Sequence, residues 1–130
     1  MKISIIVISL VVIVIGGCAS TETVKESEGQ GISRTYPYPY DAVYDATISA
    51  AKSQELEIVE TEKTKGRLIF KHGVTLWSWG ENIAVFIKPL SPNSTEVEIV
   101  SEPVMAPFNI PPDWQHILLD KINDELRGSK

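Results

Sequence analysis

Two runs of residues decide the fold: Asn82-Ile-Ala-Val-Phe-Ile-Lys88 and Thr95-Glu-Val-Glu-Ile-Val-Ser101, joined across Ser91-Pro-Asn-Ser94. The second run alternates apolar and acidic residues, which is typical of a strand with one face in the core and Glu96 and Glu98 in solvent. The first run has apolar residues in both alternating sets, so we expect a central strand covered on both faces. The residues between the runs favour a turn. Strands joined by such a turn are antiparallel.

Three further segments are predicted to be strands. Residues 56–61 and 67–72 form a second hairpin, with Gly66 at a turn position that requires a positive φ angle. Residues 32–38 form a first extended segment, which prolines end. We expect Pro89 to end the central strand, because proline cannot donate a hydrogen bond to a neighbouring strand.

Two segments have the apolar spacing of helices. The first follows Asp41, a good N-cap residue, and runs to Ser53. The second begins at Pro112 and Asp113 and ends at Gly128, which suits a C-terminal stop. Its predicted buried stripe is Trp114, Leu118, Leu119, Ile122 and Leu126. The order β-α-β-β-β-β-α predicts an α+β fold, in which a single antiparallel sheet of about five strands carries both helices on one face.

The composition excludes several classes of function. The chain has 130 residues, enough for one domain, and carries 12 Lys and Arg against 17 Asp and Glu, a net charge of −5. An acidic chain of this kind has no electrostatic reason to bind nucleic acid. Its single cysteine leaves no partner for a disulfide or a thiolate metal site. We therefore expect no nucleic-acid partner, no metal and no cofactor.

The N-terminal segment has the features of an export signal. Lys2 supplies positive charge, residues 3–15 are almost wholly Ile, Val and Leu, and two glycines precede the only cysteine, Cys18. The apolar run is shorter than the roughly 20 residues that a membrane-spanning helix needs. The sequence Ile15-Gly-Gly-Cys18 resembles the lipobox of bacterial lipoproteins.

That resemblance implies that residues 1–17 are a signal peptide and that Cys18 becomes the lipidated N-terminal residue, with acyl chains such as palmitate. Because Ala19 is not aspartate, it also favours the periplasmic face of the outer membrane in an organism with two membranes. The outer face of the cytoplasmic membrane is the alternative. An ordinary secretory signal and an uncleaved membrane anchor are the other interpretations of this segment.

Residues 18–31 are predicted to comprise the lipidated cysteine and a flexible tether, because they are polar and acidic, and residues 32–130 the α+β domain. The order of elements and the sequence Tyr40-Asp-Ala-Val-Tyr-Asp-Ala46 resemble the helix-grip domains of the accessory lipoprotein of the outer-membrane barrel-assembly machine and of related uncharacterised envelope lipoproteins. The resemblance covers residues 32–127. It implies a domain that binds partners and carries no catalytic residues.

The candidate catalytic and metal-binding residues have ordinary structural interpretations. His72 and His116 lie in different elements, and neither has a second ligand at metal-binding spacing. Ser78 does not belong to a Gly-x-Ser-x-Gly motif. His72, at the end of a strand, is the one for which a role in a site stays open. Three acidic residues are expected on a solvated strand face: Glu57, Glu60 and Glu62. We expect no enzyme.

The aromatic residues are the best candidates for a binding surface. Trp77 and Trp79 share one face of a strand by their spacing, and Met105 and Phe108 lie in a proline-rich segment. They either line the core or form a partner surface. The resulting hypothesis is a lipid-anchored envelope protein that acts as a non-catalytic binding or assembly-factor domain close to the membrane. Its expected partner is an envelope protein complex. The alternative is a carrier or sensor of a small apolar ligand held between sheet and helix.

Overall fold

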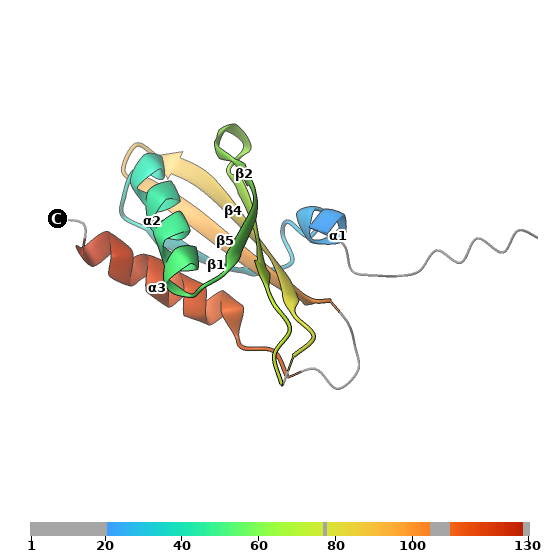
Figure 1. The fold of residues 1–130 in the computed structure, drawn as a ribbon. Helices are drawn as coiled ribbons and strands as arrows, with labels where there is room; N and C mark the ends of the chain where they lie inside the picture. The colour runs from blue at the N-terminus through green and yellow to red at the C-terminus, as the bar shows by residue number, and fades with distance from the viewer. Residues whose placement is uncertain (1–20, 77, 105–109, 129–130) are drawn as a thin grey trace, which may run out of the picture.

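The computed structural model describes residues 21–76, 78–104 and 110–128 (Figure 1). Five strands form one antiparallel sheet in the order β1-β5-β4-β3-β2, which confirms the predicted α+β fold. The strands are β1 (Ile32–Tyr36), β2 (Glu57–Glu62), β3 (Arg67–His72), β4 (Glu81–Ser91) and β5 (Ser94–Pro103). The helices are α1 (Thr21–Lys25), α2 (Tyr40–Ser53) and α3 (Trp114–Gly128), with a short 3-10 turn, η1 (Lys63–Lys65), between β2 and β3.

The inner face of the sheet, the one that α2 and α3 cover, holds the main core (Figure 1). Alternate residues of the central strands point into this layer, and α3 buries the whole of its predicted stripe. Each large aliphatic side chain that is fully buried contributes roughly 1.5–3 kcal/mol, so this layer supplies most of the stability. Its fully buried members include Val43, Leu68, Phe70, Ile83, Val85, Val97, Ile99, Leu118, Leu119 and Ile122.

The central strand does not end at Pro89, as predicted, but continues to Ser91. Pro89 pairs with Thr95 of β5 on one side. On the other side, the N–H of Ile87 donates to the carbonyl of Gly66, which precedes β3. The nitrogen two residues further on points to the same side. The nitrogen of Pro89 therefore points past the end of β3, where no hydrogen bond to a strand is needed.

Two other local predictions have different outcomes. The hairpin of β2 and β3 is confirmed, and Gly66 adopts the expected positive φ of 67°. The start of α2 is two residues earlier than predicted. Pro39 occupies the N-cap position without a side-chain cap bond, so Asp41 lies in the first turn of the helix instead of capping it.

The outer face of the sheet, opposite α2 and α3, is partly covered by residues 24–31 (Figure 1). α1 lies on this face, and Val24 is fully buried against a second apolar cluster. The prediction of a flexible tether therefore does not hold for the part of residues 18–31 that the structure describes. Glu98, expected in solvent, is buried in the same region. The cluster consists of Val24, Ile69, Ala84, Phe86 and Val100.

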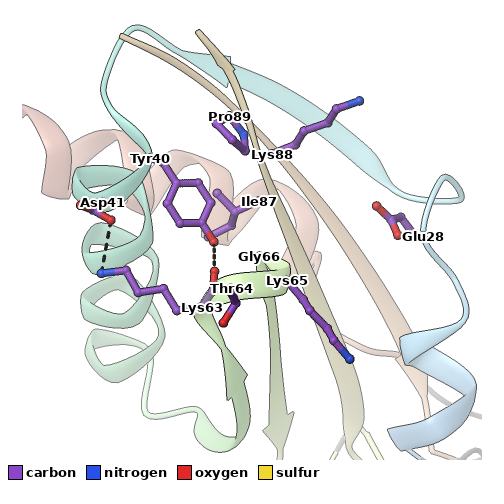
Figure 2. Close-up of a pocket in the computed structure, with 10 residues that line it drawn as sticks. All are labelled: Glu28, Tyr40, Asp41, Lys63, Thr64, Lys65, Gly66, Ile87, Lys88 and Pro89. Carbon is purple, nitrogen blue, oxygen red and sulfur yellow. Dashed lines mark hydrogen bonds and ion pairs between the residues drawn. The ribbon is translucent and has the colours of Figure 1, made fainter. Parts of the chain in front are cut away.

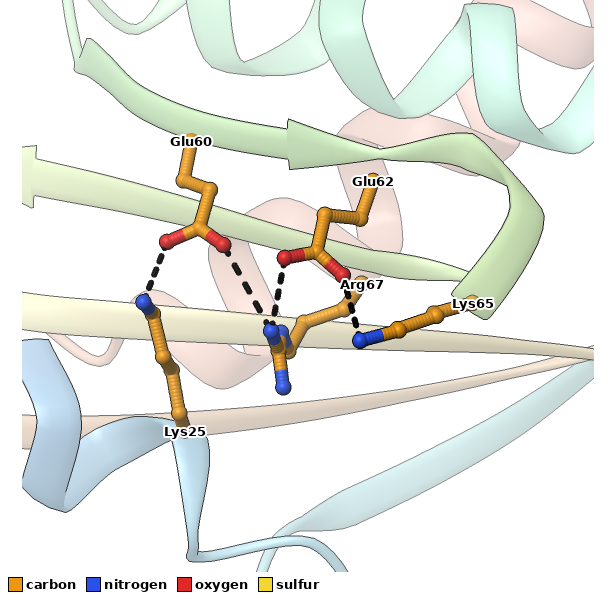
Figure 3. A network of polar contacts seen from close by, with 5 residues as sticks. All are labelled: Lys25, Glu60, Glu62, Lys65 and Arg67. Atoms are coloured by element: carbon orange, nitrogen blue, oxygen red, sulfur yellow. Dashed lines mark hydrogen bonds and ion pairs between the residues drawn. The ribbon is translucent and has the colours of Figure 1, made fainter.

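Two of the three glutamates predicted to be solvated are half-buried and ion-paired on this outer face (Figure 3). Lys25 Nζ lies 2.5 Å from Glu60 Oε2, and Arg67 Nη2 lies 2.9 Å from Glu62 Oε1. The hydrogen bond from Lys25 is the main reason that the pKa of Glu60 falls to about 2. Glu57 alone is exposed as expected. The network links α1 to the β2–β3 hairpin.

Tyr36 provides a test of the inner layer. Its side chain is 2% exposed, and its hydroxyl donates to the carbonyl oxygen of Leu119 in α3 at 2.6 Å. We expect Tyr36→Phe to lower the free energy of unfolding at neutral pH by about 1 kcal/mol, since a buried acceptor loses its partner. Urea unfolding followed by circular dichroism would measure this change.

The same variant should alter the response to alkali. Burial raises the pKa of Tyr36 to about 12 from the ordinary value of 10.0. A raised folded-state pKa contributes stability that is fully present below the unfolded pKa and is lost as the pH rises through the folded pKa. Wild type should therefore lose stability between about pH 10 and pH 12, and Tyr36→Phe should lose less of it. Identical alkaline profiles for the two proteins would contradict this assignment.

Candidate functional site

Among the residues predicted to form a partner surface, Trp79 lies in the described part of the chain. Its side chain is 49% exposed, so Trp79 is not a core residue. Trp77, Met105 and Phe108 lie outside the described residues, and so does Cys18. Trp79 lies in the connection between β3 and β4, at one end of the sheet.

Trp79 belongs to an apolar surface at this end of the sheet. The connection between β3 and β4, residues 73–80, contains no charged residue. It exposes Leu76 by 95% and Val74 by 69%, and Ile110, on the segment that leads into α3, is 71% exposed. Exposed large apolar side chains are ordinary when they are scattered, but a group of them marks an interaction site. We call Val74, Leu76, Trp79 and Ile110 the apolar end surface.

Hydrogen bonds hold the described residues of this connection to one another and to the end of β5. The N–H of Thr75 donates to the carbonyl of Ser78 at 2.8 Å and closes a turn. The N–H of Gly80 donates to Ser78 Oγ at 3.0 Å, and the N–H of Val104, just after β5, donates to the carbonyl of Gly80 at 2.9 Å. The exposed side chains therefore project from a connection that is held in place, which lowers the entropy cost of binding.

A buried carboxylate lies beneath this connection. Glu81, the first residue of β4, is fully buried. Its Oε2 lies 2.6 Å from His72 Nδ1 and 3.4 Å from Trp114 Nε1, and its Oε1 accepts the hydroxyl of Ser78. A carboxylate inside a protein needs such donors, because an unpaired buried charge is strongly destabilising. Glu81 thus joins the end of β3, the connection and the start of α3.

The sequence left open whether His72 has a role in a functional site. Its side chain is 19% exposed, and it borders a hollow of about 460 Å³ whose lining is mainly apolar. The hydroxyl of Ser78 donates to Glu81 and not to the imidazole, so these described residues do not form a serine–histidine pair of the kind that activates a nucleophile. The geometry of Ser78, His72 and Glu81 suits a structural role, in which they hold the connection between β3 and β4 in position. The hollow is lined by His72, Thr75, Ile110, Pro111 and Pro112.

His116 has a structural role at the start of α3. Its backbone N–H donates to Asp113 Oδ1 at 3.2 Å, and its Nδ1 lies 2.6 Å from Asp113 Oδ2. The hydrogen bond from the ring lowers the pKa of Asp113. Residues 21–76, 78–104 and 110–128 contain no group of three or more His, Cys, Asp and Glu side chains that could hold a metal ion.

A second, larger hollow of about 630 Å³ lies at the opposite end of the sheet, beside η1 and the end of β4 (Figure 2). Three of its lining residues are Lys63, Lys65 and Lys88, but their ammonium groups point apart in Figure 2. Two of these lysines are already paired, Lys63 with Asp41 at 3.3 Å and Lys65 with Glu62 at 3.4 Å. The charges do not converge on one point, so this hollow is the weaker candidate.

The layer between the sheet and α2 bears on the predicted alternative, a small apolar ligand held there. Side chains from both sides fill this layer, and Val43, Ala50 and Leu118 are fully buried in it. Close packing of this kind leaves no cavity among these three residues. The apolar-ligand alternative stays a prediction.

In the part of the chain that the structure describes, no helix combines the length and the apolar character needed to cross a bilayer.

A family model described as a protein of unknown function (DUF3568) matches residues 1–101. No curated protein matches the chain. The crystal structure of Ara h 8.0201 is similar with a TM-score of 0.44 and 13% identity, over 75% of this chain and 93% of that one. The crystal structure of TTHA0849 from Thermus thermophilus is similar with a TM-score of 0.39 and 13% identity, over 76% of this chain and 97% of that one.

Proposed function

We propose that this chain, which belongs to the DUF3568 family, is a lipid-anchored envelope protein whose domain binds a protein partner close to the membrane without catalysis. The lipid is attached to Cys18, and the periplasmic face of the outer membrane is the proposed location. The partner is an envelope protein or complex, for which the domain acts as a binding or assembly factor.

The anchor part of the proposal rests on the sequence Ile15-Gly-Gly-Cys18 and on the apolar run before it. The family match begins at residue 1 and so includes this segment. Two or more acyl chains give stable membrane attachment where one does not, because each buried methylene contributes about 0.8 kcal/mol.

The binding part rests on one observation, the apolar end surface. Leu76 is almost completely exposed on a connection that hydrogen bonds hold in place; Trp79 is exposed on the same connection, and Ile110 shares a hollow with its Thr75. Large apolar and aromatic side chains displayed in this way are the usual anchors of protein–protein interfaces. The hydroxyl of Ser78 donates to Glu81 and not to His72, so this group lacks the serine–histidine contact that would activate a nucleophile, and its geometry supports a binding role.

Photo-crosslinking in intact cells would test the binding part. A photoreactive residue placed separately at Leu76 and at Ile110 should capture the same envelope protein, identified by mass spectrometry. Leu90 provides a control, because it is an exposed apolar residue, at 50%, near the opposite end of the sheet. A photoreactive residue at Leu90 should not capture that protein.

A charge in the surface should abolish the capture. We expect Leu76→Asp to remove the crosslink from Ile110 while leaving the melting temperature unchanged, since Leu76 makes little contact with the folded domain. Equal capture from Leu76, Ile110 and Leu90, or capture that survives Leu76→Asp, would count against the proposed surface.

A further inference from the structure

The clearest unexplained feature of the molecule is a buried carboxylate on the outer face of the sheet. Glu98 is 8% exposed, and both of its oxygens accept backbone N–H groups from a segment 67 or more residues away in the sequence. The N–H of Gly29 donates to Oε1 at 2.8 Å, and the N–H of Gly31 donates to Oε2 at 2.9 Å. Charge-assisted bonds of this type are about twice as strong as neutral ones.

The two glycines are what permit this contact. A Cβ at Gly31 would lie 2.3 Å from the carbonyl oxygen of Ile99, so no larger residue fits against β5 there. Gly29 has a φ of 91°, which disfavours any side chain. The sequence suggested that Gly29-Gln-Gly31 is part of a flexible tether. In the structure, the backbone N–H groups of its two glycines bind Glu98.

The same segment is attached at its other end as well. Val24 is fully buried in the apolar cluster of the outer face, and the hydroxyl of Ser27 donates to its carbonyl. Lys25 joins the ion network that includes Glu60 and Arg67 (Figure 3). A helix as short as α1 is not stable alone, so these contacts with the sheet hold it. We call residues 24–31 the strap.

We propose that the strap is a reach-limiting device, closed onto Glu98 and the outer face in this structure, that fixes how far the domain can stand from its membrane anchor. This inference rests on the proposed lipid at Cys18. With the strap closed, residues 21–24 are helical in α1, so the chain from Cys18 to Val24 can span at most about 15 Å. With the strap open, the chain from Cys18 to Ile32 can span about 50 Å. Opening also uncovers the apolar cluster on the outer face.

The closed strap has a direct consequence for the apolar end surface. It keeps that surface within a short distance of the bilayer, so a partner is met at the membrane and not far above it. The contacts of the strap are few and separate from the inner core. It can therefore open as a unit without unfolding the sheet, as local segments of low stability do.

Hydrogen exchange measured by mass spectrometry on the full chain in mild detergent would test closure. Glu98→Ala removes both acceptors, and we expect exchange in residues 27–31 to accelerate by about tenfold or more, with the exchange of β4 and α3 unchanged. Glu96→Ala is the matched control, since Glu96 lies two positions earlier on the same face of β5, and the strap N–H groups of Gly29 and Gly31 donate to Glu98 instead. Equal exchange in the two variants would overturn the proposal.

Should Glu98→Ala prevent folding, Val24→Ser provides a second variant. It weakens the opposite end of the strap and leaves the Glu98 site in place. The same acceleration over residues 24–31 is expected, and exchange identical to wild type would again overturn the proposal.

Energy transfer to a labelled lipid would test the reach. A donor dye on Ser49→Cys, an exposed position of α2, reports the distance from the domain to the vesicle surface. Combining this label with Glu98→Ala should lower transfer relative to the label with Glu96→Ala; equal transfer despite faster exchange would overturn the reach-limiting role. If the protein does not associate with vesicles at all, the proposed lipid anchor fails, whereas the exchange measurement still decides whether the strap closes.

Discussion

Replacing Glu81 with alanine is expected to lower the free energy of unfolding by about 3 kcal/mol or more. Glu81 is fully buried and accepts hydrogen bonds from Ser78 and Trp114 while pairing with His72. The substitution leaves all three groups without their acceptor, and two of them, Ser78 and Trp114, are buried. The cost of such orphaned donors is far larger than the net value of the bonds themselves.

Urea unfolding followed by circular dichroism would measure the loss, with Glu57→Ala as the control. Glu57 is an exposed glutamate of β2, so its replacement should change stability by less than about 0.5 kcal/mol. Glu81→Gln should fall between the two, because the amide keeps one acceptor but presents a donor to groups that also donate. A loss below about 1 kcal/mol for Glu81→Ala would show that the cluster does not hold the end of the sheet together.

The hydrogen bonds of Glu81 also hold the connection that carries the apolar end surface. We therefore expect Glu81→Ala to weaken binding at this surface. Ser78 bonds to Glu81 and receives the N–H of Gly80, so losing Glu81 frees the connection that carries Leu76 and Trp79. Crosslinking from Leu76 should then weaken even in cells where the variant still accumulates, because a mobile connection must be ordered again on binding.

The sequence predicted the inner layer well, because that layer depends on periodic patterns. The stripe of α3 from Trp114 to Leu126 follows the helical repeat, and Val97 and Ile99 follow the strand repeat. Such patterns are local, and they are visible whatever the rest of the chain does. The antiparallel order of the sheet followed from the short turns between strands.

The outer face could not be predicted in the same way. The strap has one large apolar residue, Val24, and its other contacts include the hydrogen bonds to Glu98, 69 residues beyond Gly29. No local sequence pattern indicates a contact between residues so far apart in the chain. The alternation of apolar and acidic residues in β5 predicted that Glu98 lies in solvent. Gly29-Gln-Gly31 was the available sequence signal for this contact, since two glycines also permit a close approach to a neighbouring backbone.

The candidate site shows a similar limit. The spacing of Trp77 and Trp79 drew attention to the connection between β3 and β4, but it could not tell a core position from an exposed one. The pairing of His72 with Glu81 arises because β3 and β4 place these residues opposite one another across the sheet. A search for ligands at helical or turn spacing does not detect a pair formed by strand register.

Replacing Cys18 with alanine is expected to have the largest effect on location. If Cys18 carries the acyl chains, Cys18→Ala removes the attachment chemistry, and the protein should move from the membrane fraction to the soluble fraction or accumulate unprocessed. Incorporation of labelled fatty acid should fall to background in the same cells. Ser20→Ala, two positions later, is the control that should leave both readouts unchanged.

The outcome separates the three interpretations of the N-terminal segment. A lipoprotein loses fatty-acid labelling with Cys18→Ala, whereas a protein with an ordinary secretory signal has no labelling to lose. An uncleaved anchor keeps the variant in the membrane at the same mass as wild type, because its attachment resides in the apolar run of residues 3–15 and not in the thiol. Ala19→Asp should shift a true lipoprotein from the outer to the inner membrane fraction, so an unchanged distribution would contradict the proposed location and leave the anchor itself intact.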